Sequence, residues 1–158
     1  MKKSSAGILL YKFTNARIQF FLMHPGGPYY IKKDQGVWSI PKGEFDEKED
    51  SFLAAKREFL EETGQNIEME KAIELNPFKT KSGKIVHAWA IEGDIDHSVI
   101  MSNNFTLEWP PKSGNYKEFP EMDKAEWFFA DIARVKILES QLTFIDQIQS
   151  ILNIKSKS

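Results

Sequence analysis

Apolar side chains concentrate in two segments near the start of the chain, at residues 5–13 and 17–24. Both segments are rich in aliphatic and aromatic residues, which favour strands, and only residues 14–16 separate them. The pattern therefore predicts a β-hairpin. Proline and glycine at 24–28 then predict a tight turn.

Less regular structure is expected after this turn. The basic and aromatic residues 29–36 predict a loop, and Val37–Ile40 predicts a short strand that Pro41 ends.

A helix is predicted at about residues 50–63. Asp50 or Ser51 can cap its first turn, and Gly64 can adopt the left-handed conformation that often ends a helix. The large apolar residues are expected on the side away from the glutamates, so that one face packs and the other presents carboxylates. These apolar residues are Phe52, Leu53, Phe59 and Leu60.

The second half of the chain predicts further strands and one long loop. A strand is expected near 72–80 and a clearer one at Lys84–Ile91, with the turn at Ser82-Gly83 joining them as a hairpin. Residues 93–124 are polar and irregular, and a loop of that length is usually functional or mobile.

The C-terminal part predicts one strand and two helices. The strand is Ala125–Phe129, and Asp131 can cap a short helix after it. Ser140–Ile154 carries apolar residues at helical spacing and predicts the second helix. The tail at about 155–158 is expected to fray. Strands and helices follow one another without a repeating β-α-β order. We therefore expect an α/β (α+β) fold, with a mixed sheet covered by helices, in a single domain over residues 1–158.

Composition narrows the class of protein. A chain of 158 residues, of which 41% are hydrophobic, suits one globular domain. A net charge of −2 gives no reason to expect nucleic-acid or membrane partners, and no apolar stretch approaches the roughly 18 residues of a membrane span. The apolar run near the N-terminus is too short for a signal peptide. The absence of cysteine excludes thiolate zinc sites and disulfides, and it fits a cytoplasmic location.

The predicted helix carries a cluster of carboxylates. Glu58 lies three positions before Glu61 and four before Glu62, and these spacings place side chains on one helix face. Three carboxylates so close repel one another, and a hard divalent cation with oxygen ligands, such as Mg²⁺, would relieve the repulsion.

The segment Gly43–Gly64 resembles the Nudix box, G-x5-E-x7-R-E-U-x-E-E-x-G-U, where U is a bulky apolar residue. The matching positions are Gly43, Glu49, Arg57, Glu58, Phe59, Glu61, Glu62 and Gly64. Gln65 departs from the pattern, and we expect Ile67 to supply the packing of the missing aliphatic residue. The resemblance implies an α/β/α sandwich in which the box forms a loop-helix-loop.

The resemblance also implies a metal site. Glu58 and Glu62 correspond to the main metal ligands, Glu61 to a further ligand, and the backbone carbonyl of Gly43 to an additional one. The implied cation is Mg²⁺, with Mn²⁺ as a possible substitute.

Catalytic roles follow from the same resemblance. Arg57 is expected to orient the carboxylates by ion pairing, and Glu49 to act through water or through another ligand. The general base is a box glutamate, here Glu58, or an acid on a distant loop. The loop candidates precede Ala125–Phe129; they are Glu118, Glu121 and Asp123, and the alternative for each is a plain solvated acid.

Several residues are candidates for substrate contacts, each with a plainer alternative. Lys42, in the sequence Pro41-Lys42-Gly43, can meet phosphate or remain a surface lysine. Lys33, beside Lys32, can hold distal phosphates or be merely solvated. His24 can bond a phosphate or be a satisfied turn histidine. Trp38 can stack on a base or belong to the core, and the same holds for Tyr29, Tyr30 and Trp89.

The function implied is Mg²⁺-dependent hydrolysis of a phosphoanhydride in a small nucleotide. Dinucleoside polyphosphates such as diadenosine tetraphosphate are favoured by Pro41-Lys42-Gly43 and the basic loop. Residues 78–84 lack the tyrosine common in such enzymes, so nucleoside triphosphates remain an alternative. Three other functions are disfavoured. A non-catalytic binding module commonly loses box glutamates, which are all present here, and a prenyl diphosphate isomerase usually needs a cysteine, which is absent. A decapping enzyme usually has an added RNA-binding region, which this sequence does not show. The protein is expected to be a monomer or homodimer.

Overall fold

The computed structural model describes residues 4–68 and 70–153. It begins with the expected hairpin of β1 (Ser4–Thr14) and β2 (Arg17–Pro25), which pair antiparallel. Asn15 and Ala16 form the two-residue turn, both with positive φ, a conformation that suits the twist of hairpin strands. The expected tail at 155–158 and the last residue of the expected helix lie outside the described residues.

Seven strands of the described chain form one mixed sheet, in the order β4-β6-β1-β2-β9, with β3 on β1 and β5 on β6. The pair β1–β6 is parallel and the other pairs are antiparallel. The remaining strands of this sheet, in chain order, are β3 (Lys42–Phe45), β4 (Ile73–Glu74), β5 (Phe78–Lys79), β6 (Ile85–Glu92) and β9 (Met122–Phe129).

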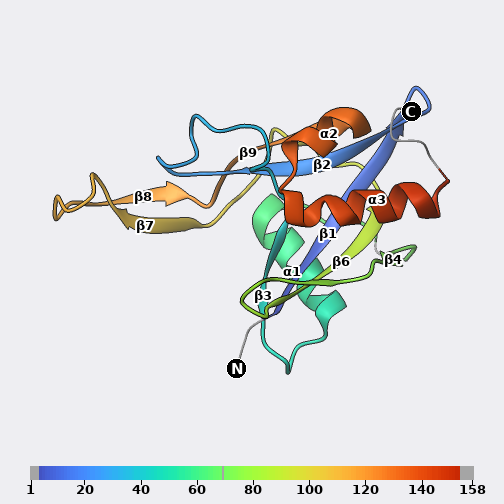
Figure 1. Ribbon diagram of the computed structural model, residues 1–158, viewed down its shortest axis with the longest axis horizontal. Coiled ribbons are helices and arrows are strands. Elements are labelled where there is room, and N and C mark those ends of the chain that lie inside the picture. The colour runs from blue at the N-terminus through green and yellow to red at the C-terminus, as the bar shows by residue number, and fades with distance from the viewer. Residues whose placement is uncertain (1–3, 69, 154–158) are drawn as a thin grey trace.

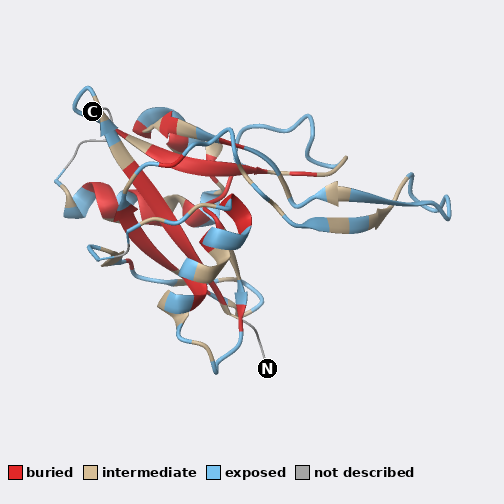
Figure 2. Cartoon of the chain, turned by 180° about the vertical axis from the view of Figure 1, so that it is seen from behind, coloured by how far each residue is buried: buried red, intermediate tan, exposed pale blue. Residues whose placement is uncertain are grey.

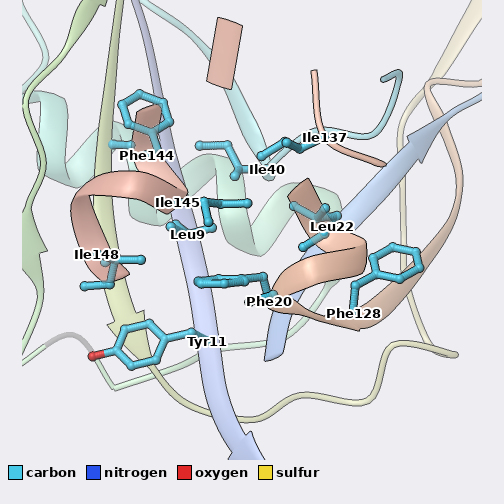
Figure 3. Packing of buried hydrophobic residues seen from close by; sticks show 14 of the residues in the cluster. Leu9, Tyr11, Phe20, Leu22, Ile40, Phe128, Ile137, Phe144, Ile145 and Ile148 are labelled. Atoms are coloured by element: carbon cyan, nitrogen blue, oxygen red, sulfur yellow. The ribbon is translucent and has the colours of Figure 1, made fainter. Parts of the chain in front are cut away.

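Helices cover both faces of the sheet, as Figure 1 shows. One face packs against α2 (Ala130–Lys136) and α3 (Leu142–Ile151), where Leu9, Phe20 and Ile145 are fully buried (Figure 3). The other face packs against α1 (Ser51–Thr63). Because successive strand residues point to opposite faces and both faces are covered, the middle parts of β1 and β2 are apolar on both sides and buried (Figure 2). The expected mixed sheet with helices on its faces is confirmed.

The strands β1 and β2 diverge, and this divergence positions the box. β1 pairs with β2 through Tyr11–Thr14 but with β3 through Ser4–Gly7. The segment before β3 lies between them, since the Pro41 carbonyl accepts from Ile8 N–H at 3.1 Å and Ser39 exchanges backbone bonds with Met23. Gly7 is required at this crossing, because a Cβ there would lie 2.6 Å from the Pro41 carbonyl oxygen.

The prediction of a continuous strand at Val37–Ile40 is therefore wrong. Trp38 and Ser39 make isolated bridges, and the strand of this region is β3, after Pro41. The expected strand near 72–80 is divided into β4 and β5, although the hairpin with β6 through Gly83 is present. Asp131 does not cap α2 but lies inside its first turn.

The largest error concerns residues 93–124, expected to be irregular. They contain β7 (Asn104–Glu108) and β8 (Tyr116–Pro120), an antiparallel pair that projects from the body as an arm. None of the residues of β7 and β8 is fully buried, so the hydrophobic signal of the arm is weak (Figure 2). A short 3₁₀ turn, Glu139–Gln141, precedes α3. Within the described chain, no helix is long and apolar enough to cross a membrane.

Candidate active site

The helix α1 forms where capping predicts it. The Asp50 side chain accepts from Leu53 N–H at 3.0 Å, and Gly64 ends the helix with φ of 72°. Its orientation differs from expectation, because Leu53 and Leu60 are 57% and 43% exposed. The buried side instead carries Phe59 and, on the same side, Glu62.

Glu58 is seated against the first glycine of the box. A Cβ built on Gly43 would lie 1.7 Å from Glu58 Oε1, so no other residue type leaves room for this carboxylate. Burial, followed by the neighbouring Glu61, raises the pKa of Glu58 to about 7. The contact brings the backbone of β3 and the carboxylate of α1 to one place.

Glu62 is the most buried acid of the box, at 9% exposure. Its Oε2 atom has no hydrogen-bond partner in the protein. Burial and, next, the charge of Glu58 raise the pKa of Glu62 to about 8. A buried carboxyl oxygen without a partner is costly, and it indicates a ligand that completes its surroundings.

Lys42 adjoins these two carboxyls. Burial and then the charge of Lys84 lower the pKa of Lys42, whereas Glu62, Glu44 and Glu58 oppose that shift. The Lys42 side chain is thus partly buried beside the acidic cluster rather than free at the surface.

Arg57 holds the outer acids. Its guanidinium donates to both oxygens of Glu49, at 2.8 and 2.9 Å, and lies 3.2 Å from Glu58 and 3.4 Å from Glu61. The bidentate pair lowers the pKa of Glu49 and raises that of Arg57. These ion pairs place Arg57 beside the carboxylates that it is expected to orient, and the orienting role stays a prediction.

One loop acid reaches the cluster. Glu121 lies between β8 and β9, and its charge contributes to the raised pKa values of Glu58 and Glu62. Asp123 instead bonds His24, and Glu118 lies on β8 of the arm. Glu121 is therefore the loop candidate that the fold brings to the box.

Three expected substrate contacts lie elsewhere. His24 is buried, with Nδ1 2.8 Å from Asp123 and Nε2 2.6 Å from the Lys33 carbonyl, so neither nitrogen is available to phosphate. Trp38 is 2% exposed and packs between His24 and Phe128, which corrects the expectation that it stacks on a base. The Lys33 ammonium lies over the Tyr30 ring on the exposed loop, 5.4 Å from its centroid.

The departure from the box pattern at Gln65 has a structural role that the sequence did not suggest. Its amide donates to the carbonyls of Asp96 and Val99, at 2.8 and 3.1 Å, and accepts from Asp96 N–H. It thereby fixes the segment after β6. Ile67 packs against the core under α1, as expected.

The chemistry of these residues fits a hard cation. Carboxylates and a backbone carbonyl are oxygen donors of the kind that Mg²⁺ and Mn²⁺ prefer, and the orphaned Glu62 oxygen supplies an unsatisfied donor. Among the described residues, no three acidic or histidine side chains are gathered tightly enough to hold an ion in this conformation. Glu61 pairs with Arg57 and also lies beside Glu58, whose pKa it raises.

Raising the pH from about 4.5 to about 8 should destabilise the metal-free protein. In that window folded Glu62 keeps a proton that the unfolded chain, with an ordinary pKa of 4.5, has lost. The stability present below pH 4.5 is therefore lost as the pH approaches the folded pKa. At about 1.4 kcal/mol per pKa unit, this shift, part of which comes from the charge of Glu58, corresponds to a loss of several kcal/mol. Urea unfolding in chelator measures it, and Glu62→Gln should flatten the profile; an unchanged profile would contradict the assignment.

The family model described as NUDIX domain matches residues 1–146. A sequence comparison with curated proteins gives no match.

Solved structures share the fold. An Ap4A hydrolase from C. elegans, in a binary complex, superposes with a TM-score of 0.61 at 21% identity, over 96% of this chain and 98% of that one. The NUDIX domain of NrtR from Shewanella oneidensis, complexed with ADP ribose, gives 0.64 at 14% identity, over 96% and 89%. A mutT/nudix family protein from Listeria innocua gives 0.59 at 16%, over 96% and 94%. The family match shows that this chain belongs to the Nudix family and is a hydrolase acting on phosphoanhydride bonds, and these structures share its fold.

Proposed function

We propose that this protein is a Mg²⁺-dependent pyrophosphohydrolase of nucleoside-diphosphate-linked substrates, with dinucleoside polyphosphates such as diadenosine tetraphosphate as its preferred class. The observation that carries the proposal is the pair Glu58 and Glu62. One carboxyl is seated on Gly43, and the other is buried with an oxygen that has no partner. Two adjoining acids that are costly to ionise without a cation are expected of a metal site rather than of a structural helix face.

Nudix proteins generally use divalent metal cations. Glu58, Glu62, Glu61 and the Gly43 carbonyl would hold the ion. When bound, it polarises a phosphoryl oxygen and lowers the pKa of water.

The side chains of this protein have distinct tasks in the proposed reaction. Arg57 fixes the orientation of Glu58 and Glu61 through its ion pairs. Glu121 or Glu58 accepts the proton of the attacking water, because both belong to one electrostatic cluster. Lys42 supplies a positive charge beside that cluster, where a phosphate would be bound.

The preference for dinucleoside polyphosphates rests on the sequence Pro41-Lys42-Gly43 and on the basic loop at residues 29–36. The likeness to the C. elegans Ap4A hydrolase, at 21% identity, supports the fold alone. Nucleoside triphosphates are the alternative, cleaved to a monophosphate and pyrophosphate.

A substrate panel with Mg²⁺ tests the proposal. It comprises nucleoside triphosphates, diadenosine polyphosphates, nucleotide sugars, ADP-ribose and diphosphoinositol phosphates, and isotopically labelled water locates the attacked phosphorus. We expect the highest kcat/KM with a diadenosine polyphosphate, and no turnover in chelator. A preference for triphosphates would select the alternative. Tight nucleotide binding without hydrolysis in any metal would instead indicate a binding module.

The cytoplasmic location, the single domain over residues 1–158 and the monomeric or homodimeric state stay predictions. Fractionation, limited proteolysis and light scattering would test them in turn.

A further inference from the structure

The strand β9 carries one extra residue opposite the end of β2. The pairing passes from His24 with Lys124 directly to Pro25 with Met122, so Asp123 has no partner across the strands. An extra residue of this kind forms a β-bulge, which bends its strand and changes the direction of nearby side chains. Bulges are common beside active sites, where they aim a side chain.

This bulge decides how the residues before it are oriented. Strand side chains alternate between the two faces, so one residue more or fewer moves every following side chain to the opposite face. Met122 packs against the core under α1, as Ala125 does, although an uninterrupted strand would place residues three positions apart on opposite faces. The orientation of the chain at Glu121, the next residue toward the arm, is therefore set by the bulge.

The side chain of Asp123 ties the bulge to a buried anchor. Its Oδ1 atom lies 2.8 Å from Nδ1 of His24, which is 1% exposed. The other ring nitrogen, Nε2, donates to the Lys33 carbonyl at 2.6 Å, because a carbonyl can only accept. The imidazole also packs edge-on against Trp38, with ring centroids 5.1 Å apart. The His24 ring is thus held on several sides, and its bond to Asp123 fixes the bulge.

The backbone of Glu121 is held beside the same bulge. Its N–H donates to the Asn103 carbonyl at 2.8 Å, and its carbonyl accepts from Gly26 N–H at 2.8 Å. A Cβ on Gly26 would lie 2.0 Å from the Pro120 carbonyl oxygen, so a glycine is required for this close approach. The end of β2 therefore contacts the chain on both sides of the bulge.

Glu121 depends on this backbone for its position. The residue is exposed, so no packing around its side chain holds it in place. Its charge nevertheless contributes to the raised pKa values of Glu58 and Glu62. A proton acceptor must lie within hydrogen-bond reach of the attacking water, and a displacement of about 1 Å can cost on the order of 100-fold in rate. The approach of Glu121 to the box is therefore sensitive to the bulge.

We propose that Asp123 and His24 are positioning residues for Glu121: their bond holds the bulge of β9, and the bulge directs Glu121 toward the acids of the box. The inference rests on the proposed function, since it names what aims one of the two proton acceptors of that reaction. It gives the buried His24 a role in turnover that requires no contact with the substrate.

A double-mutant cycle on kcat, with the best substrate and Mg²⁺, tests the proposal. We expect Glu121→Gln to lower kcat by about 100-fold or more, and Asp123→Ala to lower it by about 10- to 100-fold with little change in KM. In the Glu121→Gln background, Asp123→Ala should change kcat by less than about 3-fold, because the acid that it positions is already lost. Asp123→Asn should retain most of the activity, since its amide can donate to Nδ1 of His24.

A purely structural role would give another pattern, in which Asp123→Ala costs the same factor with and without Glu121. That result would overturn the positioning role in an otherwise active enzyme. Full activity of Asp123→Ala or of Glu121→Gln, or equal losses in Asp123→Ala and Asp123→Asn, would do the same. A native protein that turns over no substrate of the panel would instead refute the proposed function, and the positioning role with it.

Asp94→Ala is the matched control and should keep full activity. It removes an aspartate from a comparable ion pair, since Asp94 lies 2.9 Å from Lys12, on the part of β1 that pairs with β2 rather than with β3. Thermal unfolding of each variant shows that the fold is retained. Hydrogen exchange at the Gly26 and Glu121 amides reports on the bulge itself, and we expect it to accelerate in Asp123→Ala but not in Asp123→Asn. Unchanged exchange in Asp123→Ala would show that the bond does not hold the bulge.

Discussion

Replacing Glu62 with glutamine should lower turnover by at least about 100-fold while leaving the fold intact. The carboxyl is 9% exposed and its Oε2 atom has no partner in the protein. Glutamine has nearly the same shape, so packing is kept, but it cannot provide a negative oxygen for a cation. Steady-state hydrolysis of the best substrate, with Mg²⁺ varied, measures the loss.

The stability of this variant separates a functional acid from a structural one. Since burial raises the pKa of Glu62 to about 8, the neutral amide should equal or exceed the native stability at neutral pH in chelator. Glu47→Gln, at an exposed position of the same box loop, is the matched control and should keep full activity. Unchanged turnover in Glu62→Gln would remove Glu62 from the metal site.

Replacing Gly43 with alanine should lower turnover by about 100-fold. The added Cβ would lie 1.7 Å from Oε1 and 2.1 Å from Cδ of Glu58, so the carboxylate must leave its place. The clash is with the end of a flexible side chain, so we expect the helix and sheet to persist. Activity and thermal unfolding of the same preparation would measure the two effects.

Gly93→Ala provides the control for a glycine replacement. A Cβ there would approach Leu10 Cδ1 at 3.3 Å, which a small movement of that methyl can accommodate, and no box carboxyl is nearby. A fully active Gly43→Ala enzyme would show that the position of Glu58 on Gly43 does not matter for turnover. A variant that fails to fold would show instead that the contact is structural.

Prediction from the sequence succeeded where neighbours in the chain determine the result. The limits of α1 follow from Asp50 and Gly64, and the first hairpin follows from a two-residue turn. These features depend on backbone hydrogen bonds over a few residues. The carboxylate spacing of the box is likewise a local helical property.

Prediction failed where distant segments decide which side chains are covered. Leu53 and Leu60 are exposed although both are apolar, because the sheet contacts α1 on the side of Phe59 and Glu62. The arm was missed because its strands alternate weakly. Apolar residues at Phe105, Leu107 and Phe119 nevertheless flank a turn that contains prolines and a glycine, and this pattern could have indicated a hairpin.

The candidate substrate contacts show the same division. His24 and Trp38 look suitable for phosphate and base as residue types, yet both are buried and bonded within the fold. Tyr29 acquires a partner only because the arm brings Trp109 beside it.

By itself the sequence determined the family, the helix of the box and the acids available for a cation, because each depends on spacing within some twenty adjacent residues. Tertiary structure alone decided that Glu62 is buried with an unsatisfied oxygen, that Glu58 lies on Gly43, and that Glu121 joins them. The physical reason is that burial and electrostatic coupling depend on distances through space. The divergence of β1 and β2 around the segment before β3 sets those distances.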